Sequence, residues 1–200
     1  MQELLVHLTA HPKKHLIFDF DQTLCKLLVD WRHWHENIAK LFQSYEPSFK
    51  EDEATHIHVQ ENYFISKYGP EVKKEIDNIC YDAEKNYSQG FVPDRELIAV
   101  LPSLKEKYSL SLWSSNDRRT IDSVFRELGL TEYFDPTISV NDVKLIKPDA
   151  DGFTRLIHPN FNYSLSDYLM IGDSRSDENA AKNSGIDFFN VITKEYIKAN

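Results

Sequence analysis

The chain is poor in cysteine and glycine and has no long apolar segment. It contains two cysteines, Cys25 and Cys80, and six glycines among 200 residues. Two cysteines are too few for a disulfide framework and lack a metal-ligand spacing, so we expect free thiols in a reducing cytoplasm, with Cys25 serving in packing. No run approaches the roughly 18 apolar residues that cross a bilayer. The start of the chain carries an acidic residue and only a short apolar patch, so we do not expect a secretory signal there.

Basic residues are also in the minority. The chain has 23 lysines and arginines and 32 aspartates and glutamates, which gives a net charge of −9. This balance argues against nucleic acid or an anionic membrane as the main partner. An anionic metabolite remains compatible with it, because a bound metal ion can reverse the sign locally. With 41% hydrophobic and 12% aromatic residues, the chain can bury the core of one domain, with or without an inserted subdomain.

Short apolar runs alternate with amphipathic segments over much of the chain. The run at 15–20 is a buried strand by its pattern, and it breaks into polar residues at Asp21. Strands alternating with helices predict an α/β fold, a Rossmann-like doubly wound parallel sheet. The expected later strands are 110–114, 137–140, 168–171 and 188–192, and the expected helices are about 94–107, 118–128, 153–157 and 177–183.

Residues 27–87 have a different texture. The segment is charged and aromatic, and from Trp31 to Phe42 its apolar residues recur at spacings of three and four. Further helices are expected at about 52–68 and, after the Gly69-Pro70 breaker, at about 71–87. Three helices, or four, are therefore expected here, with no strand. The predicted organisation is a core of residues 1–26 and 88–200 with a helical insert at 27–87.

The carboxyl ends of the predicted strands select a set of polar residues. In a doubly wound sheet, functional groups lie beyond these ends. The set contains four carboxylates, several hydroxyls and at least one lysine. Its members are Asp19, Asp21, Thr23, Ser114, Ser115, Asn116, Lys144, Lys147, Asp173, Ser174 and Asp177.

Such a set is suited to phosphoryl transfer. Carboxylates that converge without counter-charge repel one another unless a hard cation lies among them, and Mg²⁺ prefers oxygen ligands and bridges phosphate. A serine and a lysine beside the metal can bind the remaining phosphoryl oxygens. Asp19 could then attack phosphorus and form an aspartyl-phosphate. Asp21, two residues on, could protonate the leaving oxygen and later activate water.

Four of these segments resemble the motifs of one family, in its order. Residues 18–23 read FDFDQT and resemble the DxDxT signature of the haloacid dehalogenase-like hydrolases. Ser115-Asn116 after a strand is similar to the second motif, and Lys147-Pro148 is similar to the third. Residues 172–185, GDSRSDENAAKNSG, are similar to the fourth. The resemblance spans about 16–192 and implies a family core whose helical insert is a cap that closes over the site.

The resemblance also implies roles for the matching residues. The magnesium ligands would be Asp19, Asp21 through its backbone carbonyl, Asp173 and, close by, Asp177. Asp19 would be the nucleophile, Asp21 the general acid and base, and Lys147 the residue that stabilises charge on Asp19 and the phosphoryl group. The phosphate-binding set would be Thr23, which also supports the turn, with Ser115 and Asn116. The implied substrate is a small phosphorylated metabolite.

Several assignments have alternatives at this stage. Ser114 could replace Ser115 as the phosphate ligand, and Lys144 could replace Lys147. Asp177 could simply cap the following helix. Gln22 stands where many family members have glycine, which can alter the turn.

Aromatic residues of the insert have plain explanations in the sequence. His33 and His35, like His56 and His58, are two positions apart and would point to different faces of a helix. Neither pair forms a good zinc site, and we expect solvated or packed histidines. Trp31 and Trp34 share a helix face and are expected to belong to the core of the insert, with substrate contact as the alternative.

Rival functions remain compatible with the sequence. A phosphomutase of the same family differs mainly in which hydroxyl receives the phosphoryl group. A dehalogenase would not need a second aspartate such as Asp21. A phosphoacceptor receiver module would lack an insert of this length, and a binding protein without turnover also remains. The sequence does not specify the substrate or the oligomeric state.

Overall fold

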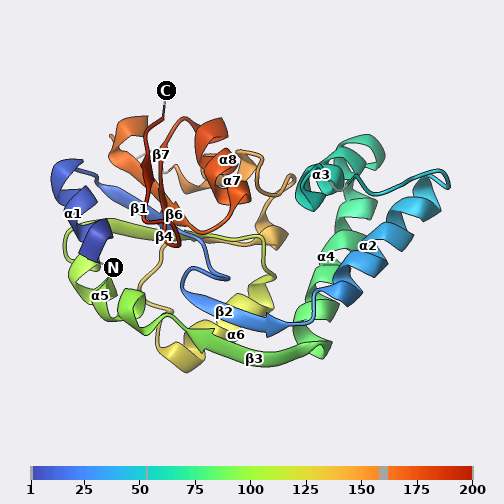
Figure 1. Ribbon diagram of the computed structural model, residues 1–200, viewed down its shortest axis with the longest axis horizontal. Helices are drawn as coiled ribbons and strands as arrows, with labels where there is room; N and C mark the ends of the chain where they lie inside the picture. Colours follow the sequence, from blue (N-terminus) through green and yellow to red (C-terminus); the bar gives the residue numbers. More distant parts are fainter. Residues whose placement is uncertain (1, 53, 158–161, 200) are drawn as a thin grey trace.

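A six-stranded sheet forms the centre of the protein. The computed structural model describes residues 2–52, 54–157 and 162–199. The strands are β1 His15–Phe18, β4 Ser109–Trp113, β5 Thr137–Ile138, β6 Tyr168–Gly172, β7 Asp187–Asn190 and β8 Tyr196–Ile197. Their order is β5-β4-β1-β6-β7-β8, with all neighbours parallel except β7 and β8. This confirms the predicted doubly wound α/β fold (Figure 1).

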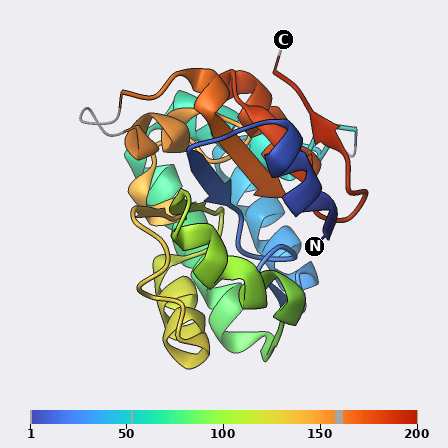
Figure 2. The same ribbon diagram turned by 90° about the vertical axis from the view of Figure 1, so that its left-hand side faces the viewer.

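Helices cover both faces of this sheet. They are α1 Gln2–Ala10, α5 Arg95–Lys105, α6 Arg118–Leu128, α7 Asp151–Leu156 and α8 Arg175–Ser184, with 3₁₀ turns at Val140–Asp142 and Leu165–Asp167. Alternate residues of β1 belong to different cores: Leu16 and Phe18 pack with α5 and α6 on one face, whereas Ile17 packs with α7 and α8 on the other. Figure 2 shows helices on either side of the strands. No helix within the described ranges is long and apolar enough to span a membrane.

Three further helices form a separate bundle beside the sheet (Figure 1). They are α2 Arg32–Tyr45, α3 Ile57–Tyr68 and α4 Pro70–Asn86, and their buried faces share a hydrophobic cluster of their own. The three predicted helices are therefore present. The predicted start of the second helix near Asp52 is wrong, because Asp52 accepts hydrogen bonds from Ala54 N and Thr55 Oγ1 in a turn. The helix starts after His56, whose ring accepts the His58 N–H as an N-cap.

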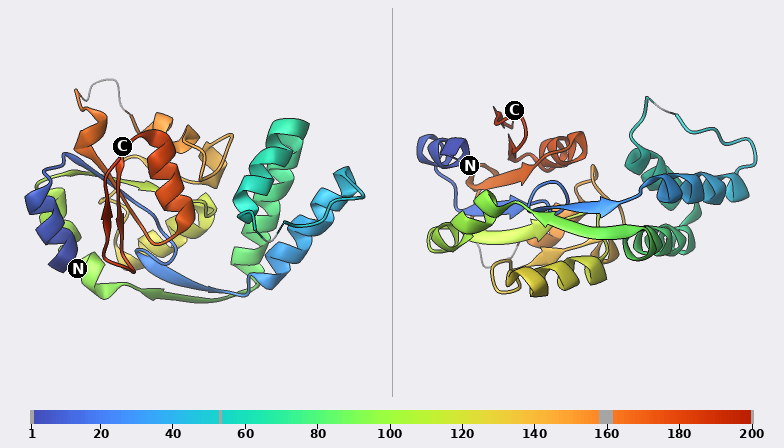
Figure 3. Two further views of the ribbon diagram at one scale, coloured as in Figure 1. Left: turned by 45° about the horizontal axis from the view of Figure 1, so that its top comes forward. Right: turned by 60° about the horizontal axis from the view of Figure 1, so that its bottom comes forward.

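An antiparallel two-stranded ribbon joins the bundle to the sheet. It consists of β2 Cys25–Val29 and β3 Ser88–Pro93, and both chain connections to the bundle run through it (Figure 3). The expectation of no strand after Leu27 is therefore wrong. Cys25 and Leu27 are buried while Lys26 and Leu28 are exposed, which is the alternation of a half-buried strand. The adjacent leucines conceal this period in the sequence, and the pairing partner lies some sixty residues away.

Candidate active site

Lys147 and Asp19 form a buried ion pair at the carboxyl edge of the sheet. Asp19 directly follows β1, and its N–H continues the ladder to Ile171 O at 2.9 Å. Lys147 Nζ lies 2.6 Å from Asp19 Oδ1 and donates to Trp113 O at 3.0 Å. Burial and the neighbouring Asp177 carboxylate raise the pKa of Asp19, against the effect of Lys147. The structure places Lys147 in this contact, whereas Lys144 is exposed.

Asp19, Asp173 and Asp177 form an acidic cluster. One carboxylate oxygen from each lies within 4.8 Å of the others. Burial, and then Asp177, raise the pKa of Asp173 to about 6. One lysine cannot neutralise three carboxylates, and an all-oxygen donor set fits a hard cation such as Mg²⁺. These residues therefore fit the metal that the sequence pattern predicts.

Asp177 serves the helix and the cluster with different oxygens. Its Oδ2 accepts hydrogen bonds from Ser174 N and Ser174 Oγ at 3.1 and 2.6 Å, in a capping box that starts α8. Its Oδ1 lies 2.5 Å from Lys147 Nζ. Gly172 makes room for this arrangement, because a Cβ there would lie 2.6 Å from Asp177 Oδ2. The two interpretations of Asp177, as capping residue and as member of the site, thus describe one side chain.

Thr23 supports the cluster from the turn after β1. Its Oγ1 donates to Asp173 Oδ1 at 3.2 Å, and the side chain is buried. Thr23 does not line the cavity described below. The structure therefore gives Thr23 the task of orienting Asp173, in place of the phosphate contact expected from the sequence. In the same turn Gln22 has φ 64°, a left-handed conformation that glycine adopts more easily, in keeping with the glycine of many family members.

Asp21 lies beside the cluster and is held by the ribbon. Its Oδ1 accepts the N–H of Leu27 in β2 at 2.7 Å. Burial raises its pKa to about 6, although the hydrogen bonds from Leu27 and Gln22 oppose this rise. A carboxyl group with a pKa near neutrality can both give and take a proton.

Ser114 and Ser115 differ sharply in their surroundings. Ser114 is buried away from the cavity, and its Oγ donates to Asn116 Oδ1 at 2.8 Å. Ser115 lines the cavity, and its buried Oγ has no hydrogen-bond partner among the residues that the structure describes. Because a buried hydroxyl needs a partner, this atom is suited to a ligand oxygen. Asn116 also lines the cavity, but its amide is engaged by Ser114 and by Glu84 on α4.

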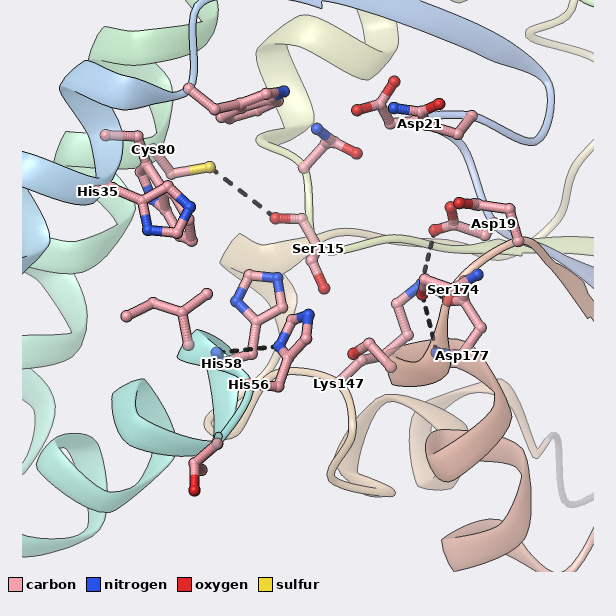
Figure 4. A pocket seen from close by; sticks show the side chains of 18 of the residues that line it. Asp19, Asp21, His35, His56, His58, Cys80, Ser115, Lys147, Ser174 and Asp177 are labelled. Atoms are coloured by element: carbon pink, nitrogen blue, oxygen red, sulfur yellow. Dashed lines mark hydrogen bonds and ion pairs between the residues drawn. The ribbon is translucent and has the colours of Figure 1, made fainter. Parts of the chain in front are cut away.

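A cavity of about 430 Å³ joins these residues to the helical bundle. Asp19, Asp21, Asp173, Ser115 and Lys147 line one side, and Figure 4 shows Asp19, Ser115 and Lys147 converging there. Residues of α2, α3, α4 and the loop before α3 line the other side. The volume falls within the range of roughly 300–1,000 Å³ for small-molecule sites.

A comparison with protein families matches nearly the whole of this arrangement. The model described as haloacid dehalogenase-like hydrolase covers residues 16–191, from β1 to the end of β7. The chain belongs to the haloacid dehalogenase-like hydrolases. This agrees with the resemblance found in the four sequence motifs, and the protein is therefore an enzyme of the hydrolase class.

Individual relatives of this hydrolase are distant. It is 28% identical over 122 residues to an uncharacterised protein of Haemophilus influenzae, a match covering 58% of this chain and 59% of the relative. It is 31% identical over 81 residues to pyrophosphatase PpaX of Bacillus velezensis, covering 40% and 37%. The matches thus span about three fifths or less of these curated relatives. A haloacid dehalogenase-like hydrolase from Bacteroides fragilis has the same fold, with a TM-score of 0.61, 22% identity and coverage of 91% and 89%.

Glu84 is a residue of this hydrolase that the sequence analysis missed. It lies on α4 with 5% of its surface exposed. Its carboxylate accepts hydrogen bonds from Asn116 Nδ2 at 2.7 Å and from Asp117 N at 3.2 Å. Glu84 therefore ties the helical bundle to the loop that carries Ser115. The available signal was its position four residues after Cys80, on the apolar stripe of a helix, where a glutamate is unexpected.

Replacing Glu84 with glutamine is expected to change the pH dependence of stability. Burial raises the pKa of Glu84 to about 7 from an ordinary value of 4.5. Because the folded state binds the proton of the Glu84 carboxyl more tightly than the unfolded state does, the free energy of unfolding of the wild type falls as the pH rises from 4.5 to about 7. The glutamine amide cannot titrate, so the free energy of unfolding of Glu84→Gln relative to the wild type should rise by about 2–3 kcal/mol between pH 5 and pH 8. Urea unfolding at both pH values measures this.

The matched control is Glu75→Gln, which changes an exposed glutamate on the same helix. We expect its unfolding free energy to stay within about 0.5 kcal/mol of the wild type at both pH values. If the free energy of unfolding depends on pH in the same way in the wild type and in Glu84→Gln, the pKa of Glu84 is not raised by folding and the prediction is wrong.

Proposed function

We propose that this hydrolase is a magnesium-dependent phosphatase that acts on a small phosphate monoester through an aspartyl-phosphate on Asp19. The observation that supports it best is the buried Asp19–Lys147 pair within the acidic cluster, opposite Ser115 Oγ, which lacks a partner among the described residues. Such a site offers a nucleophile, a charge-stabilising lysine and a hydroxyl donor for a phosphoryl oxygen. In this proposal residues 27–87 act as a cap over the core formed by residues 1–26 and 88–200.

Each residue then has a defined step. Asp19 attacks phosphorus while the ester P–O bond breaks, and Asp21 gives its proton to the departing alcohol oxygen. In the second step the Asp21 carboxylate takes a proton from water, the water oxygen attacks phosphorus, and the bond to Asp19 breaks to release inorganic phosphate. Lys147 and Ser115 hold the phosphoryl oxygens as charge develops.

The proposed metal ligands are Asp19, Asp173 and the backbone carbonyl of Asp21, with Asp177 beside them. When bound, Mg²⁺ supplies charge neutralisation for the phosphoryl oxygens. The side chain of Thr23 keeps Asp173 aligned through its 3.2 Å hydrogen bond.

Metal removal tests the proposal. EDTA is expected to reduce phosphate release from p-nitrophenyl phosphate to background, and added Mg²⁺ should restore it, because the carboxylates repel one another without a cation. Mg²⁺ should also raise the thermal unfolding midpoint, since it binds only the assembled cluster. Phosphate release that continues unchanged in EDTA would contradict the magnesium-dependent scheme.

A further inference from the structure

The cap side of the cavity is an aromatic wall of five rings, those of Trp31, Trp34, His35, His56 and His58. Neighbouring rings of the wall contact one another. Trp31 and Trp34 meet edge to face with centroids 6.0 Å apart, Trp34 and His58 are 5.7 Å apart, and His56 and His58 are 5.0 Å apart. Of the four histidines expected to be solvated or packed, His35, His56 and His58 line this cavity together with the two tryptophans. The fourth, His33, stacks on Tyr87.

This side of the cavity has no strong positive charge. Among the described residues that line the whole cavity, Lys147 on the opposite side is the one lysine and no arginine is present. Asp19 and Asp177 already pair with that lysine. The cap side adds a carboxylate, Glu51, whose Oε1 lies 3.7 Å from His35 Nδ1. A leaving group with a second acidic function would meet carboxylates here without a lysine or arginine to pair with.

Two N–H groups of the aromatic wall can serve a ligand. Trp34 is 7% exposed, and its Nε1 has no hydrogen-bond partner among the described residues. His56 Nδ1 accepts the His58 N–H at 3.3 Å, so Nε2 carries the ring hydrogen. Figure 4 shows the His56 ring reaching toward the part of the cavity where Ser115 and Lys147 lie. The aromatic wall therefore offers a ligand both flat ring faces and two N–H hydrogen-bond donors.

From these features we infer that the leaving group is an uncharged, ring-bearing alcohol with hydrogen-bond acceptors, as in a nucleoside or sugar phosphate. Its ring packs on the aromatic wall, and its acceptors meet Trp34 Nε1 and His56 Nε2. Indole and imidazole faces bind flat or C–H-rich rings well, and the cavity volume suits a ligand of this size. This inference rests on the proposed phosphatase function and specifies its substrate class.

Substrate selectivity tests the inference. With Mg²⁺ present, kcat/KM for adenosine 5′-monophosphate or glucose 6-phosphate should exceed that for 2-phosphoglycolate and pyrophosphate by about tenfold or more. The two ring esters separate the nucleoside class from the sugar class. A preference for 2-phosphoglycolate or pyrophosphate would overturn the inference.

Two conservative variants test the donors. Trp34→Phe keeps the packing of α2 but removes the indole N–H. His56→Asn keeps an N-cap acceptor for α3 but removes the ring. In each, the ratio of kcat/KM for the preferred ring ester to that for 2-phosphoglycolate should fall about fivefold, mainly through KM. An unchanged ratio in both variants would contradict the assignment.

Two further variants make the test specific. Tyr45→Phe also removes one polar hydrogen from α2, but its hydroxyl bonds Glu75 away from the cavity, so the ratio should stay unchanged. Glu51→Lys places a positive charge on the cap side and should raise kcat/KM for 2-phosphoglycolate by about tenfold. A structural disturbance would not produce that gain.

Binding separates this inference from the proposed function. Calorimetric titration of the Asp19→Asn variant with the same phosphate esters and Mg²⁺ ranks their affinities without turnover. If the wild type releases no phosphate but the variant binds ring esters tenfold more tightly, the phosphatase proposal fails and the ligand class stands. If the wild type is an active phosphatase without this ranking, the substrate inference alone fails.

Discussion

Asp19→Asn is expected to abolish phosphate release from p-nitrophenyl phosphate, with a loss of about 10⁴-fold or more in kcat. Asparagine has nearly the same shape as aspartate, but its amide is not a nucleophile and cannot form the acyl-phosphate. The same change should stabilise the fold in metal-free buffer at neutral pH. Burial and Asp177 raise the pKa of Asp19, so its charged form is unfavourable in the folded protein.

The two readouts together distinguish a catalytic role from a structural one. We expect the thermal midpoint of Asp19→Asn to rise by about 2–4 °C while activity disappears. Removing a destabilising active-site charge commonly has these opposite effects. Retained turnover would remove Asp19 as the nucleophile, whereas loss of both stability and activity would indicate that Asp19 mainly holds the fold.

Lys147→Met is expected to lower both activity and stability. Lys147 Nζ is buried between Asp19 and Asp177, at 2.6 and 2.5 Å from their oxygens. Methionine fills a similar volume but leaves these buried carboxylates without a counter-charge, which costs about 3–5 kcal/mol of folding free energy in comparable sites. The loss of the charge that stabilises the phosphoryl group should lower kcat by about 10²–10³-fold. Urea unfolding and steady-state kinetics measure the two effects.

Lys144→Met is the matched control, because it removes the same charge three residues earlier from an exposed side chain. Its kcat and unfolding free energy should remain near those of the wild type. Added Mg²⁺ should recover part of the stability of Lys147→Met, since the cation can replace the missing charge in the cluster. If kcat and the unfolding free energy are the same in Lys147→Met and Lys144→Met, Lys147 does not have the charge-stabilising role proposed for it.

The sheet and the edge that carries the candidate site were predictable because their signals are local. β1 is continuously buried and is followed directly by Asp19, and β6 before Asp173 has the same pattern. The carboxyl ends of parallel strands lie at one edge of the sheet, so the sequence alone predicts that residues far apart in the chain lie close together there. The helices of the bundle were predictable for a similar reason, since Gly69 separates α3 from α4, which begins at Pro70.

The features that the sequence did not predict depend on contacts between residues that lie far apart in the chain or on the exact start of a helix. β2 is stable because it pairs with β3, sixty residues later, and its five residues alone give an ambiguous pattern. Glu84 is explained by hydrogen bonds to a loop of the core, and nothing in α4 itself predicts them. The histidines at 56 and 58 could be judged only as members of a helix. In the structure His56 precedes that helix as its N-cap, so the expectation that a helix would separate their faces did not apply.

The ribbon has a consequence for the timing of proton transfer. The Asp21 carboxylate accepts the N–H of Leu27, so the proposed proton donor is held by the strand that leads into the helical bundle. Because both chain connections to the helical bundle run through β2 and β3 (Figure 3), a swing of the bundle relative to the sheet would bend these strands and shift the support of Asp21. In the proposed mechanism, the acid that protonates the leaving group is thus mechanically coupled to the bundle that covers the cavity, and a bundle held open would leave Asp21 out of line with the ester oxygen.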